Sequence, residues 1–306
     1  MLARLKKKYA GYWQLYVFLL LPVTYIIIFN YIPMAGVQLA FKKYDISAGI
    51  WGSPWVGFKH FEKFFKSYMF SRVIVNTFRI SFLSLIFSFP FPVVFALLLN
   101  CVTNMRYKKA VQTITYMPHF ISVVVLVGML MQVFNSNVGL YGNLTKLITG
   151  ERPPDVFASP SAFLTLYIGS GIWQSFGWGS ILYMAALTSV DPELNEAAEI
   201  DGATRFQRVI HIEFPALIPI CTIQLIMRAG ELLSVGFQKT YLMQNDLNLR
   251  VSEVISTYVY KVGLGSGGST DFSFSTAVGL FNSVVSLTMV ICVNKLASVY
   301  GETSLW

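Results

Sequence analysis

Residues 191–217 read DPELNEAAEIDGATRFQRVIHIEFPAL, and this polar stretch decides how the rest of the chain is interpreted. Asp191 is placed to cap a helix whose first position is Pro192. Gly202 can end that helix, because glycine adopts the left-handed conformation without strain. A second helix then begins just after the glycine and runs into Pro215. We therefore predict two short helices with a bend at Gly202, a compact element suited to fill a cleft on a partner protein.

Long apolar segments stand on both sides of this loop. A helix that crosses a bilayer needs about 20 mostly apolar residues, because lipid offers no hydrogen-bond partner to exposed backbone groups. Six segments qualify, at about 15–32, 73–99, 110–134, 161–188, 212–235 and 274–296. The sequence thus predicts an all-α integral membrane protein with six transmembrane helices. Residues 1–14 form a tail, 15–306 the transmembrane domain, and 189–215 a polar loop between the fourth and fifth helices.

Two of these segments carry helix-disturbing residues. Pro90 and Pro92 predict a kink in the second segment, because proline lacks the N–H of a helical hydrogen bond. The fourth segment is interrupted by glycines, and Gly171, Ser175 and Gly179 recur at every fourth position. Such spacing of small residues allows another helix to approach closely. We interpret these glycines as packing residues.

The composition excludes an ordinary soluble domain. The chain has 306 residues, of which 55% are hydrophobic and only 12% are charged, about half the charged share of a typical soluble protein. Its net charge of +8 lies beside the apolar segments and forms no basic face for nucleic acid. Cys101, Cys221 and Cys292 have no short spacing, so they indicate neither a disulfide framework nor a metal site.

The N-terminal segment has two possible interpretations. Lysines and an arginine precede the apolar run 15–32, as they do in a signal peptide. No small-x-small cleavage site follows, and the run ends in Asn30-Tyr31-Ile32-Pro33. We therefore expect an uncleaved first transmembrane helix.

The loops give a partial answer on orientation. With the N-terminus inside, ten Lys and Arg lie on the inner side and eleven in the three outer loops, so the positive-inside rule almost ties. The compact clusters Lys6–Lys8 and Arg106–Lys109 favour the N-terminus inside. In the first outer loop, about 33–72, aromatic residues recur at helical spacing from Phe58 to Phe65. They predict an amphipathic helix at the membrane surface.

The polar loop resembles the EAA loop of ATP-binding-cassette (ABC) importer permeases. That motif is Glu-Ala-Ala, three residues, Gly, nine residues and then Ile-x-Leu-Pro. This chain departs from it only at Phe214, which stands where leucine is usual. Asp201 and Ala203 beside the glycine resemble the carbohydrate-importing branch. The residues that match the motif and its extension are Glu196, Ala197, Ala198, Asp201, Gly202, Ala203, Ile212 and Pro215.

Further pieces resemble the LplB-like permeases of poly- and oligosaccharide importers, a branch with MalF-like architecture. They are Phe41-Lys42-Lys43-Tyr44, Trp55-Val56-Gly57-Phe58, Asn76-Thr77 and Tyr116-Met117-Pro118. The similarity covers nearly the full length. It implies a multi-pass permease of the bacterial cytoplasmic (inner) membrane, with both termini and the EAA loop cytoplasmic.

The resemblance also implies a mechanism and partners. ATP closes a dimer of two separate ATP-binding subunits, and the EAA loop transmits that movement to the transmembrane helices in an alternating-access cycle. Glu196 is implied to make a polar or ionic contact with the ATPase. A second permease, giving a heterodimer, and an extracytoplasmic solute-binding protein that delivers a saccharide complete the implied assembly. ATP and Mg²⁺ would bind to the partner ATPase, so no cofactor is expected in this chain.

No enzymatic site is predicted. The chain contains no G-x-x-x-x-G-K-[ST] phosphate loop. Gly263, Gly265 and Gly268 fit G-x-G-x-x-G, but no strand precedes them, and we interpret them as a flexible connection. His60, His119 and His211 have no metal-ligand spacing.

The transmembrane segments offer candidates for a solute path. Aromatic rings with amide and hydroxyl groups suit sugars, which have apolar CH faces and polar edges. Arg79, Arg228 and Glu231 are ionisable residues in or beside such segments, and Arg228 and Glu231 could pair across one helical turn. The residues we single out are Trp173, Gln174, Trp178, Tyr183, Gln224, Arg228 and Asn282, with Ser283 beside the last.

Three alternatives stay open from sequence. An ABC permease of the same architecture could carry an amphiphile or a peptide, because the EAA loop indicates coupling to an ATPase and does not identify the transported molecule. An ion-coupled secondary transporter would work without an ATPase, although the two halves show no repeat of the kind such proteins have. A membrane scaffold would leave the EAA spacing unexplained.

Overall fold

The computed structural model describes residues 12–231, 233, 235–265 and 270–300. Over these residues the chain is helical, and its one β feature is an isolated bridge between Lys42 and Trp55. The chain divides into two compact units. The terminal unit comprises residues 1–66 and 261–281, and the main unit comprises 67–260 and 282–306. The predicted all-α class is confirmed. The tail 1–11 and part of the predicted glycine-rich connection, 266–269, lie outside the described residues.

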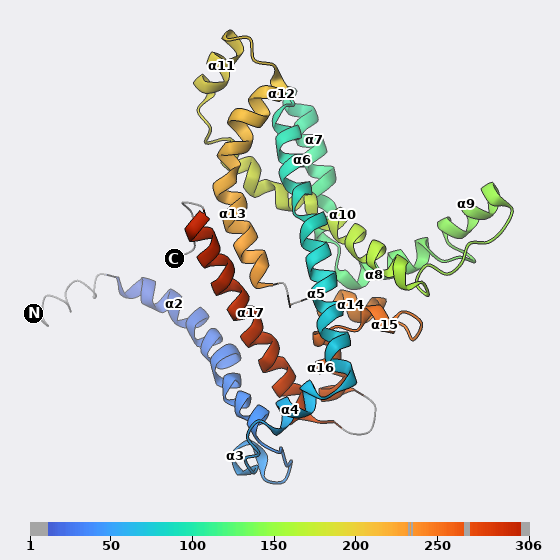
Figure 1. Cartoon of the computed structure of the whole chain (residues 1–306). Helices are drawn as coiled ribbons and strands as arrows, with labels where there is room; N and C mark the ends of the chain where they lie inside the picture. The colour runs from blue at the N-terminus through green and yellow to red at the C-terminus, as the bar shows by residue number, and fades with distance from the viewer. Residues whose placement is uncertain (1–11, 232, 234, 266–269, 301–306) are drawn as a thin grey trace, which may run out of the picture. The chain divides into compact units, whose positions relative to one another are not determined.

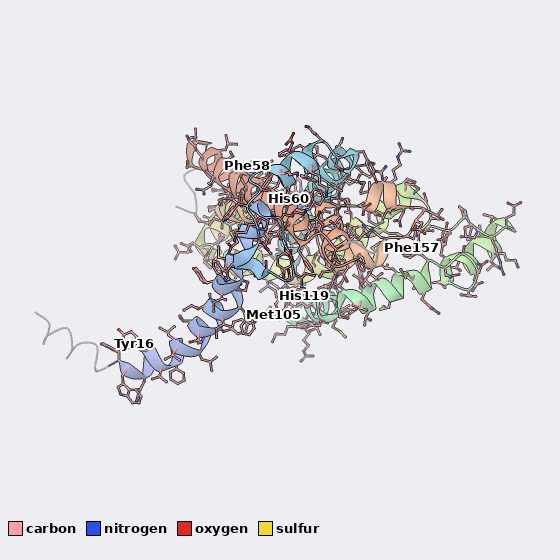
Figure 2. The ribbon with its side chains drawn as sticks, turned by 90° about the horizontal axis from the view of Figure 1, so that it is seen from below. Tyr16, Phe58, His60, Met105, His119 and Phe157 are labelled. Atoms are coloured by element: carbon pink, nitrogen blue, oxygen red, sulfur yellow. The ribbon has the colours of Figure 1, made fainter. Side chains whose placement is uncertain are left out.

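The terminal unit begins with a long apolar rod. This rod joins α2 (Trp13–Ile26), η1 (Ile27–Tyr31) and η2 (Ile32–Phe41). None of the α2 side chains is buried, and Figure 2 shows those around Tyr16 extending outward from the ribbon. An apolar helix with no buried face requires lipid or another apolar surface around it. At 29 residues the rod is long enough to cross a membrane, as predicted for the first segment.

The rest of the terminal unit is built around Phe64. This residue lies on α4 (Lys59–Phe65) and is fully buried. Its ring contacts Phe274 and Phe281 on the first turns of α17 (Phe272–Tyr300), with ring centroids 6.3 and 5.6 Å apart. The helix predicted from the aromatic spacing at 58–65 is therefore confirmed. The unit also holds α3 (Gly49–Gly52) and the end of α16 (Ile255–Leu264).

The main unit is organised around α10 (Pro160–Leu187), as Figure 1 shows. This helix packs chiefly on α6 and also on α5, α7 and α13. Small residues permit the close approach, because a side chain at Gly177 would collide with the backbone of Thr115 on α7. The elements of the unit before and after α10 are α5 (Tyr68–Ser88), α6 (Pro90–Asn100), α7 (Met105–Tyr116), η3 (Met117–Phe120), α8 (Val123–Val133), α9 (Leu140–Thr149), α11 (Pro192–Ile200), α12 (Arg205–Arg208), η4 (Val209–Glu213), α13 (Phe214–Gly230), α14 (Phe237–Met243) and α15 (Leu249–Ser252).

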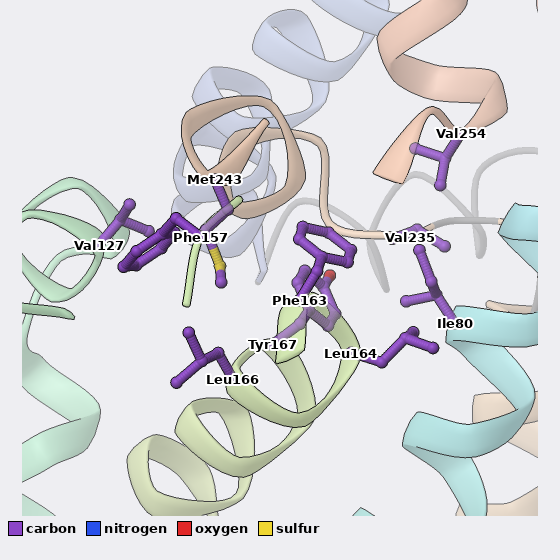
Figure 3. Packing of buried hydrophobic residues seen from close by; sticks show 10 residues of the cluster. All are labelled: Ile80, Val127, Phe157, Phe163, Leu164, Leu166, Tyr167, Val235, Met243 and Val254. Carbon is purple, nitrogen blue, oxygen red and sulfur yellow. The ribbon is translucent and has the colours of Figure 1, made fainter. Parts of the chain in front are cut away.

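Two apolar clusters hold the main unit together. The first gathers Phe163 and Tyr167 of α10 with Ile80 of α5, Val127 of α8 and Met243 of α14, as seen in Figure 3. The second joins α6, α10 and α13, and its fully buried members are Ala96 and Leu217. Between membrane-spanning helices, such clusters are stabilised by van der Waals contacts of closely packed side chains rather than by removal of apolar surface from water. The clusters therefore fix α10 at both of its ends.

The predicted spans are only partly confirmed. Four continuous helical stretches have the length and hydropathy to cross a membrane, namely 13–41, 68–100, 205–230 and 272–299. The helix α10 covers the predicted fourth segment but is not one of these four, because glycine and polar residues dilute it.

The third predicted segment, 110–134, is not one straight helix. The helical stretch Met105–Phe120 meets α8 at a bend of 98°. Pro118 lacks a backbone N–H, and Ser122 caps the new helix by accepting from the Val125 N–H at 3.3 Å. These two residues explain the break. The milder kink predicted in the second segment falls at Phe89, between α5 and α6.

The close contact of α10 with α7 yields a stability prediction. The Gly177→Ala variant should lose about 1–3 kcal/mol, because its new methyl group meets the Thr115 backbone, which cannot yield as a side chain would. Thermal unfolding in detergent, followed by size-exclusion chromatography, measures the loss. The matched control is Gly169→Ala on the same helix, where the added carbon meets nothing within 4 Å. Equal melting temperatures of the two variants would contradict this packing.

Candidate functional site

The 189–215 loop has the two-helix form predicted from its residues. The Asp191 carboxylate accepts the Glu193 N–H at 3.0 Å and caps α11. At the other end the Ala203 N–H bonds to the Ala198 carbonyl at 2.9 Å, and the Gly202 N–H to the Glu199 carbonyl at 3.1 Å. This pair of bonds is the Schellman arrangement, which places its penultimate residue in the left-handed region. Gly202 is there, with φ +82°.

The second helix of the loop begins at Thr204, just beyond the glycine. The Thr204 hydroxyl accepts the Gln207 N–H, and the Gln207 side chain accepts the Thr204 N–H, which together form a capping box. From α12 the chain continues through the wider turns of η4 into α13 without leaving the helical region. Pro215 lies in the first turn of α13, where its missing N–H is tolerated. The loop is thus directly continuous with the fifth predicted span.

Two arginines hold the loop in place. The Arg208 guanidinium lies 2.6 Å from the Glu199 carboxylate and joins α12 to α11 across the bend. Arg208 is mostly covered, whereas Glu199 is exposed. Arg205 donates to the Cys101 carbonyl at 2.8 Å, where α6 ends. The loop is therefore tied to itself and to the end of the second predicted span.

Sequence reasoning missed both contacts. The opposite charges of Glu199 and Arg208 on two neighbouring helices were a usable signal. Arg205 and Cys101 are 104 positions apart, and a bond to a backbone carbonyl leaves no trace in residue type.

The residues predicted to couple the chain to an ATPase fall into two sets. Ala198, Asp201, Gly202, Ala203 and Ile212 surround one hollow of about 320 Å³. Glu196 and Ala197 are exposed on α11, and Pro215 lies apart on α13.

Apolar residues at the tip of the loop were not predicted. Ile200 is 87% exposed and Phe206 is 72% exposed. Both are large apolar side chains on a polar loop outside the predicted spans, so they are available for contact with another surface. At the base of the loop, burial raises the pKa of the Cys101 thiol above its ordinary value, and the Glu213 carboxylate adds to this, whereas Arg205, Arg208 and Lys108 act in the opposite direction.

Several solute-path candidates are used for packing. The Trp178 ring stacks on His119, with centroids 4.6 Å apart, and Gln174 donates to the Ile121 carbonyl at 2.8 Å. Both residues thus hold α10 against the bend between η3 and α8. Tyr183 is buried in the second apolar cluster. Trp173 is exposed and Gln224 half-buried.

The polar candidates lie beside a small cavity. A space of about 150 Å³ is lined by Ser81, Ser84 and Ser88 of α5 together with Arg228 and Glu231 at the end of α13. Among the described residues, Arg228 and Glu231 do not form with each other the ion pair that their spacing allowed. The serines, spaced three and four apart along one helix face, are a signal that sequence reasoning overlooked.

Two further polar groups of the main unit have unusual surroundings. The Asn282 side-chain oxygen is buried and has no hydrogen-bond partner in the described part of the chain. Lys239, on α14, is buried and donates to the Tyr167 carbonyl at 2.7 Å. Burial lowers the pKa of Lys239 to about 8. Sequence analysis named Asn282 but not Lys239.

Comparison with known proteins places the chain in a family. The model of the family described as "binding-protein-dependent transport system inner membrane component" matches residues 17–298. Protein LplB of Bacillus subtilis (strain 168) is 40% identical over 292 residues, which are 95% of this chain and 91% of that protein. The polygalacturonan/rhamnogalacturonan transport system permease protein YteP of the same organism is also 40% identical, over 95% of this chain and 90% of its own.

Solved structures agree with these relatives. One chain of a bacterial ABC transporter involved in import of the acidic polysaccharide alginate is 39% identical, with a TM-score of 0.87, and the match covers 97% of this chain and 99% of that one. A chain of a bacterial alginate transporter in complex with an alginate pentasaccharide-bound periplasmic protein gives a TM-score of 0.88 at 38% identity, over 99% and 100%. The resemblance inferred from the sequence is confirmed at the level of the family. This chain belongs to the binding-protein-dependent transport system inner membrane components.

Proposed function

We propose that this chain is a transmembrane permease subunit of an ABC importer that takes up a poly- or oligosaccharide delivered by an extracytoplasmic binding protein. The observation that carries the proposal is the match over nearly the whole chain to a family and to relatives that move polysaccharides. The transport mechanism is alternating access, which is driven by ATP hydrolysis on partner subunits. The full sequence has no phosphate loop of its own, which agrees with this division of labour.

The 189–215 loop is the coupling element in this proposal. A conformational movement is transmitted from one protein to another by an element with discrete positions rather than by a loose contact. The Schellman turn, the capping box and the Arg208–Glu199 pair supply that rigidity. The exposed Ile200 and Phe206 supply apolar anchors for an ATPase cleft.

The topology in this proposal has six crossings with both termini cytoplasmic. The helix α10 is the crossing that hydropathy alone does not pick out, and its burial against α5, α6, α7 and α13 compensates for its glycines. The bent stretch from α7 to α8 crosses as one broken span. The loop 189–215 then lies on the cytoplasmic side, and α4, α9 and α14 lie on the outer side.

The assembly includes a second permease chain. An apolar rod such as α2, with no buried side chain, leaves surface for a related subunit as well as for lipid. The cavity lined by Ser81, Ser84 and Arg228 is the favoured start of a solute path, because it gathers hydroxyl and charged groups among transmembrane helices. The second candidate function is an ABC importer permease for a non-sugar solute, since the 189–215 loop does not identify the transported molecule.

The turn at Gly202 provides a direct test of coupling. The Glu196→Lys plus Gly202→Asp double variant should lose saccharide-stimulated ATP hydrolysis by about tenfold or more, because a side chain is strained at φ +82° and the docking charge is reversed. The assay is hydrolysis by the reconstituted transporter with its ATPase, partner permease and binding protein.

The matched control for this variant is Gly150→Asp. Gly150 ends α9 with the same φ of +82°, so the two substitutions strain the backbone alike. The control should retain stimulated hydrolysis. Unchanged hydrolysis in the double variant, with the protein still folded in membranes, would contradict the coupling role and favour an ion-coupled transporter.

The Arg208–Glu199 pair yields a second prediction. Arg208→Gln should lower the amount of saccharide imported per ATP hydrolysed, because α11 is no longer fixed to α12. Glu199→Gln should have a similar effect, and the double variant should be no worse than either single one, as expected for one shared interaction. Uptake of labelled saccharide and phosphate release are measured in the same proteoliposomes. Fully additive losses would show that the two residues act separately.

A further inference from the structure

The terminal unit contains a cavity that none of the functions discussed so far uses. It has a volume of about 570 Å³, within the range of small-molecule sites. Three segments form its walls, namely the chain after η2 with Lys43 and Tyr44, the helix α4 with Lys59 and Lys63, and the start of α17. All of these lie in one compact unit. The cavity is therefore defined by contacts within that unit alone.

The cavity carries an excess of positive charge. Of its three ammonium groups, that of Lys63 is paired with the Asp271 carboxylate at 3.0 Å. Burial raises the pKa of Asp271, but hydrogen bonds from the Phe274 N–H and from Lys63 outweigh it, so the pKa lies below its usual value and the carboxyl is ionised. Among the described residues, Lys43 and Lys59 have no carboxylate within 4.0 Å. Two ammonium groups are thus available to an anion.

Aromatic rings stand beside these charges. Tyr44 and Phe272 both line the cavity, with their rings edge to face at 5.8 Å. The backbone around Tyr44 is fixed, because its N–H donates to the Ser273 hydroxyl at 2.9 Å. On the α4 side the buried His60 ring lies 3.1 Å from the Lys42 carbonyl. The walls are consequently held in position before any ligand arrives.

We propose that this cavity binds a carboxylated sugar residue of the incoming saccharide. An ammonium group recognises a carboxylate as a point charge, and an aromatic ring accepts the CH face of a pyranose. A neutral sugar would bring no anionic group to Lys43 and Lys59. A small inorganic anion would bring no CH face to the aromatic rings of the cavity. The inference rests on the proposed function and its topology, in which α4 and the walls of this cavity lie on the side from which cargo is delivered. It adds an acidic cargo and a place where that cargo first meets the permease.

The test is direct binding to the full-length chain in nanodiscs of zwitterionic lipid. The probes are trigalacturonate, the neutral trisaccharide maltotriose and inorganic phosphate, each titrated by calorimetry. Trigalacturonate should bind, and maltotriose should bind at least tenfold more weakly. Affinity for trigalacturonate should fall as salt rises from 50 to 500 mM, because charges at exposed sites are screened.

Charge-neutralising variants locate the site. Lys43→Gln and Lys59→Gln should each weaken trigalacturonate binding by about three- to fivefold, as expected for a partly solvated ion pair. The matched control is Lys66→Gln at the end of α4, an exposed lysine that pairs with Glu62 at 2.6 Å and lies outside the cavity. It removes the same charge and should change the affinity less than twofold. An equal loss in Lys66→Gln would overturn the proposal in favour of a general charge effect.

Other ligands of the cavity would give different results in the binding experiments. Equal binding of maltotriose, or displacement of trigalacturonate by millimolar phosphate, would overturn the sugar-carboxylate assignment. Binding of soluble short-chain phosphatidylglycerol that is lost in the Lys43→Gln plus Lys59→Gln variant would overturn the assignment in favour of a lipid headgroup. Unchanged trigalacturonate binding in the Lys43→Gln plus Lys59→Gln variant, with weaker docking of the binding protein, would assign the cavity to an acidic protein surface. Binding is measured without ATPase or uptake, so its outcome is independent of the coupling experiments.

Discussion

The left-handed turn at Gly202 is the constraint on which the geometry of the 189–215 loop depends. It reverses the chain between α11 and α12, and only then can Arg208 reach Glu199 across the bend. The same turn places Arg205 against the carbonyl of Cys101 at the end of α6. A different backbone at this one residue would separate both contacts. The exposed Ile200 would then no longer stand on a fixed frame.

Close helix packing fixes the helices inside the main unit, as the turn at Gly202 fixes the loop. The helix α10 is too polar to be recognised as a span by hydropathy, yet it is the element on which α5, α6, α7 and α13 converge. Its glycines have low helix propensity, but Gly177 allows α7 to approach α10 closely. A movement imposed on the 189–215 loop enters α13 directly and α6 through Arg205. Both of these helices pack on α10, which gives the movement a contiguous route.

The sequence predicted what local chemistry specifies. Asp191, Pro192 and Gly202 defined the two-helix loop, and aromatic spacing located α4, because caps, left-handed residues and periodicity act over a few positions. The sharp bend at Pro118 was missed because an apolar run of the right length reads as one helix. Tyr183 and Trp178 were predicted to line a solute path, which stays a prediction; the structure adds that Tyr183 packs in an apolar cluster and that Trp178 stacks on His119. Lys239 and the cation-lined cavity depend on contacts between distant segments, which residue types alone do not reveal.

The central claim is that the rigid tip of the 189–215 loop docks onto an ATPase. The most direct measurement is photo-cross-linking from a benzoylphenylalanine at Ile200 in the assembled transporter, compared with one at Leu147. These positions are 87% and 83% exposed, so both probes are equally accessible, but Leu147 lies on α9. The account predicts a cross-link to the ATPase subunit from position 200 and none from position 147. A cross-link from 147 alone, or equal capture from both, would contradict it.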